Sequence, residues 1–229
     1  MRSLKQLFLF LSIGLLFACG GKENNVKFEE MSESEKISYL NAKIRKEPNN
    51  ADLFFKRSET LFKKGELTEA YSDIERAILI EKKKVEYHVL KADILFAQGD
   101  TDLAFSALQT AKEVDGKYIE AYLKSAELSL YLKDYEKTMF DVKQAIILDK
   151  LNPTAYFLRG WALKEQGDTI NAVKDYQKAI ELKSDYEQAY EELGILYAQK
   201  GDALAIEYLN STININPKNY SAMYILALF

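Results

Sequence analysis

The sequence predicts an all-α fold in which antiparallel helix pairs stack into one solenoid. The main observation is a set of four residue rows that recur every 34 residues between positions 65 and 201. A second observation is that only three prolines and ten glycines interrupt 229 residues. So few residues that interrupt secondary structure are typical of helices joined by short turns, and less typical of a sandwich with many strands.

Each row of the repeat has a physical reason. The first row marks the turn between two helices and consists of Gly65, Gly99, Lys133, Gly167 and Gly201, each followed by an acid. Two rows of small residues follow: Ala70, Ala104, Thr138 and Ala172, then Ala77, Ala111, Ala145 and Ala179. A large apolar row lies between them: Ile74, Leu108, Val142 and Tyr176. Glycine tolerates the left-handed conformation that ends a helix, and small residues let paired helices approach closely.

These rows divide the chain into five complete repeats and two partial ones. The complete repeats are 51–84, 85–118, 119–152, 153–186 and 187–219. A single helix from about Ser34 to Lys46 precedes them, and residues 220–229 begin a sixth repeat. Helices of about 13 residues are marginal in isolation, so we expect them to exist by packing on one another. Asn152 followed by Pro153 predicts a helix cap and first turn.

The N-terminus has the features of an export signal. Arg2 and Lys5 precede 12 apolar residues from Leu7 to Ala18. A helix needs about 20 apolar residues to cross a bilayer, so residues 1–18 fit a secretory signal peptide. Leu16 to Gly20 resembles the lipobox of bacterial lipoproteins, which implies that Cys19 is acylated and becomes the mature N-terminus. Residues 19–31 are polar and non-periodic, and we interpret them as a flexible tether.

The repeats resemble a known family. The fifth repeat contains Tyr190, Leu193, Gly194 and Tyr197, followed at family spacing by Ala205, Leu209 and Pro217. This pattern resembles the tetratricopeptide repeat (TPR) over nearly all of residues 32–229. The resemblance implies a right-handed superhelix of helix pairs with a concave inner surface, and a scaffold that binds other proteins.

In this family, a second face of each first helix lines the concave groove. The residues on that face are Phe55, Glu59, Phe62, Val89, Asp93, Phe96, Leu123, Glu127, Leu130, Phe157, Trp161 and Lys164. An exposed helix face should be polar, whereas this one is largely apolar in four successive repeats. We expect it to bind a protein or peptide partner with apolar anchors and some basic character. The alternative is that these side chains mainly close the superhelix.

Composition excludes several other functions. Of the 31 lysines and arginines, Arg2 and Lys5 lie in the signal segment, and the remaining 29 face 35 acids. This acidic balance argues against nucleic acid as a partner. One cysteine and one histidine allow neither an internal disulfide nor a histidine metal cluster, and His88 is expected to pack in the fold. No phosphate-binding loop or nucleophile elbow occurs, so we expect no enzyme activity, no cofactor and no metal.

Two pairs of opposite charges are expected inside repeats. Arg57 and Arg159 each have an acid 16 residues later, Asp73 and Asp175, and antiparallel packing should join them. Repeat three has Ser125 in the arginine position and should lack this bridge. Residues 220–229 contain no charged residue. Because no helix is predicted to stack beyond them, one apolar side of this last helix should remain exposed to solvent.

The two resemblances together imply an exported scaffold or assembly factor, anchored by lipid to the cell envelope of a Gram-negative bacterium. We expect the outer membrane, although the sequence itself leaves open which membrane and which face. One alternative is an extracellular lipoprotein that binds a glycan or peptide, for which exposed aromatic platforms would be typical. The other is a cytosolic TPR scaffold whose hydrophobic N-terminus is misread. The sequence leaves the oligomeric state open.

Overall fold

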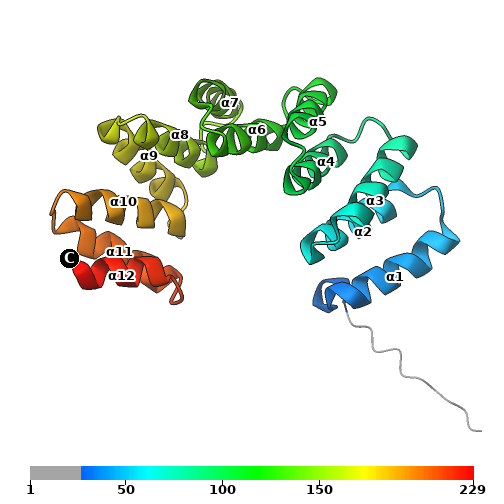
Figure 1. Cartoon of the computed structure of the whole chain (residues 1–229), viewed down its shortest axis with the longest axis horizontal. Helices are drawn as coiled ribbons and strands as arrows, with labels where there is room; N and C mark the ends of the chain where they lie inside the picture. The colour runs from blue at the N-terminus through cyan, green and yellow to red at the C-terminus, as the bar shows by residue number, and fades with distance from the viewer. Residues whose placement is uncertain (1–26) are drawn as a thin grey trace, which may run out of the picture.

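The computed structural model describes residues 27–229, which form twelve α-helices and no strands (Figure 1). The predicted signal peptide, Cys19 and most of the tether lie outside the described residues. The helices are α1 (Glu33–Lys46), α2 (Ala51–Lys64), α3 (Leu67–Ile80), α4 (Val85–Gln98), α5 (Thr101–Val114), α6 (Ile119–Tyr131), α7 (Tyr135–Leu148), α8 (Pro153–Glu165), α9 (Thr169–Leu182), α10 (Glu187–Gln199), α11 (Leu204–Ile215) and α12 (Tyr220–Leu228). The predicted all-α solenoid of helix pairs is confirmed.

The helices stack along a curved path. Helices α2 to α11 form five pairs, each within one predicted repeat, while α1 and α12 are single helices at the two ends. Figure 1 shows an arch in which α4 and α6 face the interior and α5 and α7 stand on the outside. The first helices of the repeats therefore line the concave side.

The turns within pairs adopt the conformation that the glycine row predicts. Gly65, Gly99, Gly167 and Gly201 have φ angles of 83°, 90°, 85° and 65°. Lys133, in the slot without glycine, adopts the same left-handed region at 61°. The predicted cap is also present, because Asn152 Oδ1 accepts a hydrogen bond of 3.1 Å from the Ala155 N–H.

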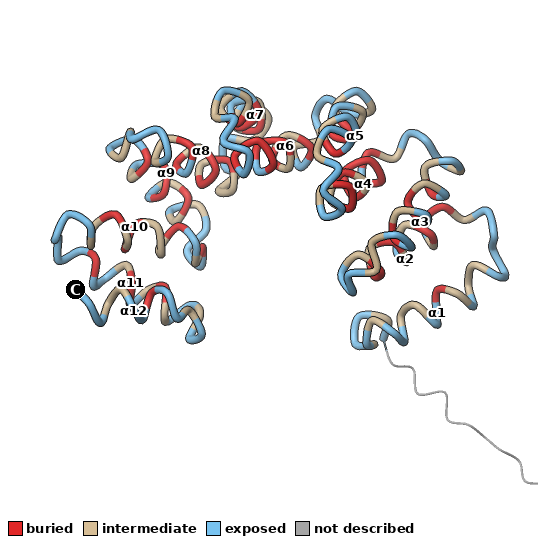
Figure 2. Tube along the Cα trace, viewed as in Figure 1, coloured by how far each residue is buried: buried red, intermediate tan, exposed pale blue. Residues whose placement is uncertain are grey.

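The core lies between the paired helices (Figure 2). The alanines of both small rows are fully buried, as is the large row, with Ile74, Val142 and Tyr176 at 0% exposure. Gly160 is needed opposite Tyr176, since a Cβ atom there would lie 2.9 Å from the ring. Real Cβ contacts are almost never that short, so the large row and the small side chains facing it set the helix spacing.

Both predicted charge pairs form. Arg57 donates two hydrogen bonds of 2.6 Å to the Asp73 carboxylate, and Arg159 donates two of 2.6 and 2.7 Å to Asp175. Each pair joins the two helices of its repeat with the bidentate geometry that guanidinium favours. Arg57 has a third contact, of 2.6 Å, with Asn41 on α1.

Repeat three lacks the bridge, as predicted, but its acid is still paired. Asp141 is 1% exposed and accepts a bond of 2.6 Å from Lys112 on α5. Burial lowers the pKa of Lys112, which Asp141 partly counteracts. The ion pair therefore joins two repeats instead of two helices of one repeat.

The two ends of the stack differ. Part of the expected tether forms a 3-10 turn, Phe28–Glu30, and its Phe28 ring lies 5.7 Å from the Tyr39 ring of α1. At the other end, α12 packs Ile225 and Leu226 against the buried Leu209. The opposite side of α12 leaves Tyr224 67% and Leu228 70% exposed. Within residues 27–229, no helix has the length and apolarity that a bilayer crossing requires.

Candidate concave binding groove

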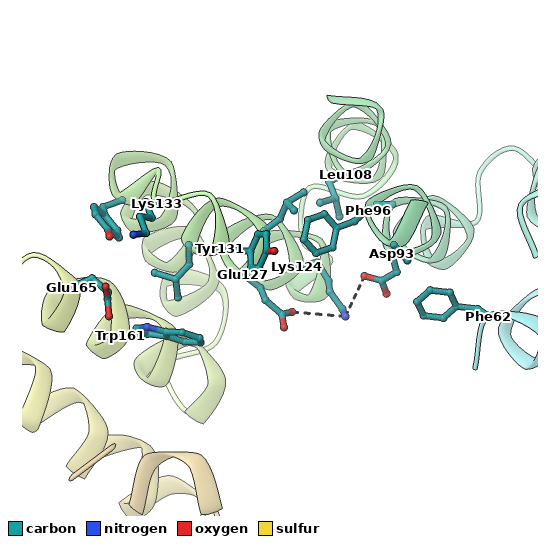
Figure 3. A pocket seen from close by; sticks show the side chains of 15 residues that line it. Phe62, Asp93, Phe96, Leu108, Lys124, Glu127, Tyr131, Lys133, Trp161 and Glu165 are labelled. Carbon is teal, nitrogen blue, oxygen red and sulfur yellow. Dashed lines mark ion pairs between the residues drawn. The ribbon is translucent and has the colours of Figure 1, made fainter. Parts of the chain in front are cut away.

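A groove of about 600 Å³ opens on the concave side between repeats one and four (Figure 3). Four successive first helices, α2, α4, α6 and α8, supply most of its wall. Its apolar side chains include Phe62, Phe96, Leu130, Tyr131 and Trp161. Tyr131 is 74% and Trp161 38% exposed, so the groove presents aromatic surface to solvent.

Half of the predicted groove residues line this groove. They are Phe62, Asp93, Phe96, Glu127, Leu130 and Trp161. Phe55, Glu59 and Lys164 are partly buried residues on the same helices, outside the groove lining. The Phe55 ring packs 4.9 Å from that of Tyr87.

Three predicted groove residues lie in the core instead. Val89, Leu123 and Phe157 are 6 to 8% exposed and pack among buried residues. The Phe157 ring lies 5.1 Å from Tyr186 and 5.7 Å from Tyr176. These residues lie toward the start of their helices, where neighbouring repeats pack together, so their role is to close the superhelix.

The acids of the groove are partly neutralised from within. Lys124 Nζ lies 3.3 Å from the Asp93 carboxylate and 3.9 Å from that of Glu127. Burial raises the pKa of Asp93 and also that of Glu59. Burial opposes the charge on Lys124, but Asp93 and Glu127 together raise the pKa of that lysine. The Lys124 ammonium is therefore stabilised in its charged form between the two carboxylates.

Sequence reasoning missed five polar or aromatic residues of the groove: Lys124, Tyr131, Lys133, Tyr135 and Glu165. Helical spacing could have found two of them. Lys124 precedes Glu127 by three residues and Tyr131 follows it by four, so all three share one face of α6. Lys133 and Tyr135 come from the turn and start of α7, which the first-helix rows do not include.

The remaining titratable candidates are structural. His88 is 8% exposed, and its Nε2 donates to the Lys82 carbonyl at 3.0 Å. It packs within the fold, as predicted. In the part of the chain that the structure describes, no three His, Cys, Asp or Glu side chains gather to hold a metal ion.

Comparison with known proteins supports the repeat assignment. A family model described as "TPR repeat" matches residues 162–201. The BBSome complex member BBS4 of Bos taurus is 32% identical over 95 residues, which are 41% of this chain and 18% of BBS4. The matched segment thus spans less than a fifth of that relative.

Solved structures share the fold at low sequence identity. Yeast Tom70 matches with a TM-score of 0.74 and 17% identity, covering 85% of this chain and 42% of Tom70. TTC0263, a thermophilic TPR protein of Thermus thermophilus, matches with a TM-score of 0.67 and 17% identity, covering 78% of this chain and 98% of TTC0263. YrrB, described as a TPR protein with an unusual peptide-binding site, matches with a TM-score of 0.56 and 16% identity, covering 82% of this chain and 97% of YrrB. The family model thus identifies a tetratricopeptide repeat within residues 162–201, and the solved structures share the solenoid fold.

Proposed function

We propose that this protein is a membrane-anchored scaffold of the bacterial envelope that holds a segment of a partner polypeptide in its concave groove. The observation that carries the proposal is the apolar wall of that groove. Surface helix faces are normally polar, yet Phe62, Phe96, Tyr131 and Trp161 line one continuous hollow. Aromatic side chains of this kind supply most of the affinity in protein interfaces.

The size of the groove suits side chains of a peptide. Ligand sites commonly enclose about 300–1,000 Å³, and this groove falls inside that range. Its wall comes from rigid helices whose spacing the core sets. A partner would therefore meet a preformed surface and lose little affinity to ordering of the groove.

A crosslinking experiment tests the groove directly. A photoactivatable residue in place of Ala97, inside the groove, should capture a partner polypeptide in the native cell. The same residue in place of Gln109, exposed on the outer helix α5, is the control. Equal capture at both positions would contradict binding in the groove.

A matched pair of double variants tests the anchors. Replacing Phe62 and Phe96 by serine should abolish capture and leave the melting temperature nearly unchanged, because both side chains are partly exposed. The control is Leu103→Ser with Phe140→Ser on the outer helices, where both residues are more than half exposed. A large loss of thermal stability in the groove variant would show that its phenylalanines serve the core.

The membrane anchor rests on the sequence around Cys19. Cys19→Ser should release the protein from membrane fractions or leave its signal peptide uncleaved. Two acyl chains hold a protein on a bilayer far better than one, so loss of the acylated cysteine should have a large effect. A Cys19→Ser variant that fractionates like the wild type and is processed like the wild type would contradict the lipid anchor.

Exposed aromatic surface also supports a second candidate, a glycan ligand. Trp161 and Tyr131 are the exposed aromatic platforms that such a site uses. Titration with soluble cell-wall oligosaccharides, followed by Trp161 fluorescence, separates the two functions. Trp161 is the single tryptophan of the chain, so its emission reports on this groove alone.

A further inference from the structure

One slot of the repeat places a cation acceptor on the concave side in four successive repeats. Its occupants, each 34 residues apart, are Glu59, Asp93, Glu127 and Trp161. The first three are carboxylates. The face of a tryptophan ring is the best cation acceptor among aromatic side chains. All four residues of this row can therefore accept a cation, although three are acids and the fourth is a tryptophan.

Two lysines of the protein already use this row. Lys124 Nζ lies 3.3 Å from Asp93 and 3.9 Å from Glu127, between the acids of repeats two and three. Lys164 Nζ lies 5.9 Å from the centre of the Trp161 ring while it pairs with Glu192 at 2.8 Å. These contacts show how an ammonium group fits the row.

The row also has unused capacity. The position equivalent to Lys124 one repeat earlier is Leu90, which is buried and brings no charge between Glu59 and Asp93. Among the described residues, Glu59 forms no ion pair. Burial raises its pKa, and the charges of Lys63 and Lys56 on its own helix partly oppose this shift.

The far end of the row is also open. The Glu127 side chain is 64% exposed, and Lys124 reaches it only loosely. Figure 3 shows Glu127 and Glu165 flanking the Trp161 ring in this view. The groove lining carries three acids against two cations, with Lys133 at its rim as the second cation. This balance leaves room for added positive charge.

We propose that Glu59, Asp93, Glu127 and Trp161 form a cation-binding track, and that the bound polypeptide carries Lys or Arg residues along it. An apolar side chain of the same segment would lie between Phe62 and Phe96. This inference rests on the proposed function and specifies its ligand: a basic, amphipathic segment. Charge complementarity of this kind sets partner choice and speeds association.

The test uses the purified full chain and three synthetic peptides. The peptides share the same Leu and Phe positions and carry Lys, Gln or Glu at all others. The Lys peptide should bind tightest and the Glu peptide weakest, measured by peptide fluorescence anisotropy and by Trp161 emission. Added salt should weaken only the Lys peptide, because screening acts on exposed charges.

Variants then locate the effect. Glu59→Gln with Glu127→Gln should lower the affinity for the Lys peptide about three- to tenfold, as expected for two partly exposed ion pairs, and spare the Gln peptide. The control is Glu113→Gln with Glu181→Gln, two exposed acids of the outer helices α5 and α9. Circular dichroism verifies that all variants keep their helix content.

Each contrary outcome overturns the track in a recognisable way. Equal affinity for the Lys and Gln peptides would refute the track and leave the groove as a peptide site. Binding of oligosaccharides in place of all three peptides would refute it in favour of a glycan ligand. If no probe binds, the track is also refuted, and crosslinking from Ala97 decides the proposed function independently.

Discussion

Within residues 27–229, the outer face of α1 is partly covered by the preceding turn, whereas one face of α12 is uncovered. Helix α1 has Lys36 and Lys43 in the slots that hold Ala70 and Ala77 one repeat later. Phe28 of the preceding turn lies over this face, within 5.9 Å of Lys36 and 5.7 Å of Tyr39. No first helix could approach these long side chains as closely as it approaches alanine.

Helix α12 shows the opposite pattern. Its Met223 and Ala227 correspond to Tyr190 and Gly194 of α10, where Gly194 meets Leu209 of the second helix. In the described chain, nothing covers the equivalent face of α12. Small residues in these positions therefore let a further helix pack closely, whereas long polar side chains in the same positions prevent such packing and form a cap. Four experiments test this difference.

The largest effect is expected at Leu40, the one buried residue of α1. Leu40→Ala should cost about 2–4 kcal/mol of local stability, because it leaves a cavity under the helix. Hydrogen exchange should show loss of protection confined to α1. At the other end, Leu226→Ala should cost less, since Leu226 is only partly buried. Equal losses at both ends would contradict the difference.

The second effect concerns Arg57, whose guanidinium joins α2 to α3 through Asp73 and to α1 through Asn41. Arg57→Ala should cost about 1–3 kcal/mol, because it leaves the buried Asp73 carboxylate unpaired. Arg159→Ala removes the same kind of pair without the added bond to Asn41 and should cost less. Urea unfolding of both variants measures the difference, and a larger cost at Arg159 would show that Asn41 contributes nothing.

The third effect depends on pH. Glu35 accepts hydrogen bonds from the Ser32 side chain and backbone, which lower its pKa. A lowered pKa in the folded state stabilises α1 above the unfolded pKa, and this contribution is lost as pH falls through the folded one. The N-cap of α12 is an amide, Asn219, whose oxygen does not titrate. Backbone amides at the start of α1 should therefore lose protection from hydrogen exchange on acidification, as followed by NMR. Glu35→Gln should remove this pH dependence.

The smallest change in stability is expected on the open face. Tyr224→Lys with Leu228→Lys should alter unfolding by about 0.5 kcal/mol or less, since both side chains are exposed. The same variant should lower binding of a hydrophobic dye, because it removes part of a contiguous apolar surface. Leu79→Lys, an isolated exposed leucine of α3, is the control. Unchanged dye binding would mean that this face is not the principal apolar patch.

Periodicity was sufficient to predict the fold. The glycine row located the turns, and the spacing of 16 residues between Arg57 and Asp73 identified partners across a helix pair. These relations lie within one repeat, where the 34-residue period determines the geometry. Lys112 was missed as the partner of Asp141 because the contact crosses from one repeat to the next.

The groove was predicted less completely for the same reason. The period placed Val89, Leu123 and Phe157 on the groove face, whereas the structure buries them in the core. How deeply they are buried depends on the curvature of the stack, which the period leaves undefined. Lys124 and Tyr131 share one face of α6 with Glu127, so helical spacing could have found them, whereas Lys133 and Tyr135 enter the groove from the turn and the start of α7, outside the first-helix rows.

The pattern of ion pairs also has a mechanical consequence. Ion pairs join neighbouring repeats at three of the four boundaries, or seams, between the complete repeats. Glu75 and Lys91 join repeats one and two, and Glu192 and Lys164 join repeats four and five. Repeats two and three are joined by two pairs, Asp93 with Lys124 and Asp141 with Lys112. The seam between repeats three and four has none within residues 27–229, and a continuous apolar core closes it. Partly exposed ion pairs weaken as salt rises, whereas the buried pair of Asp141 and Lys112 and the apolar contacts are screened much less. A pulling force on this scaffold should therefore open the seams with partly exposed ion pairs more easily in concentrated salt, and the seam between repeats three and four should change least.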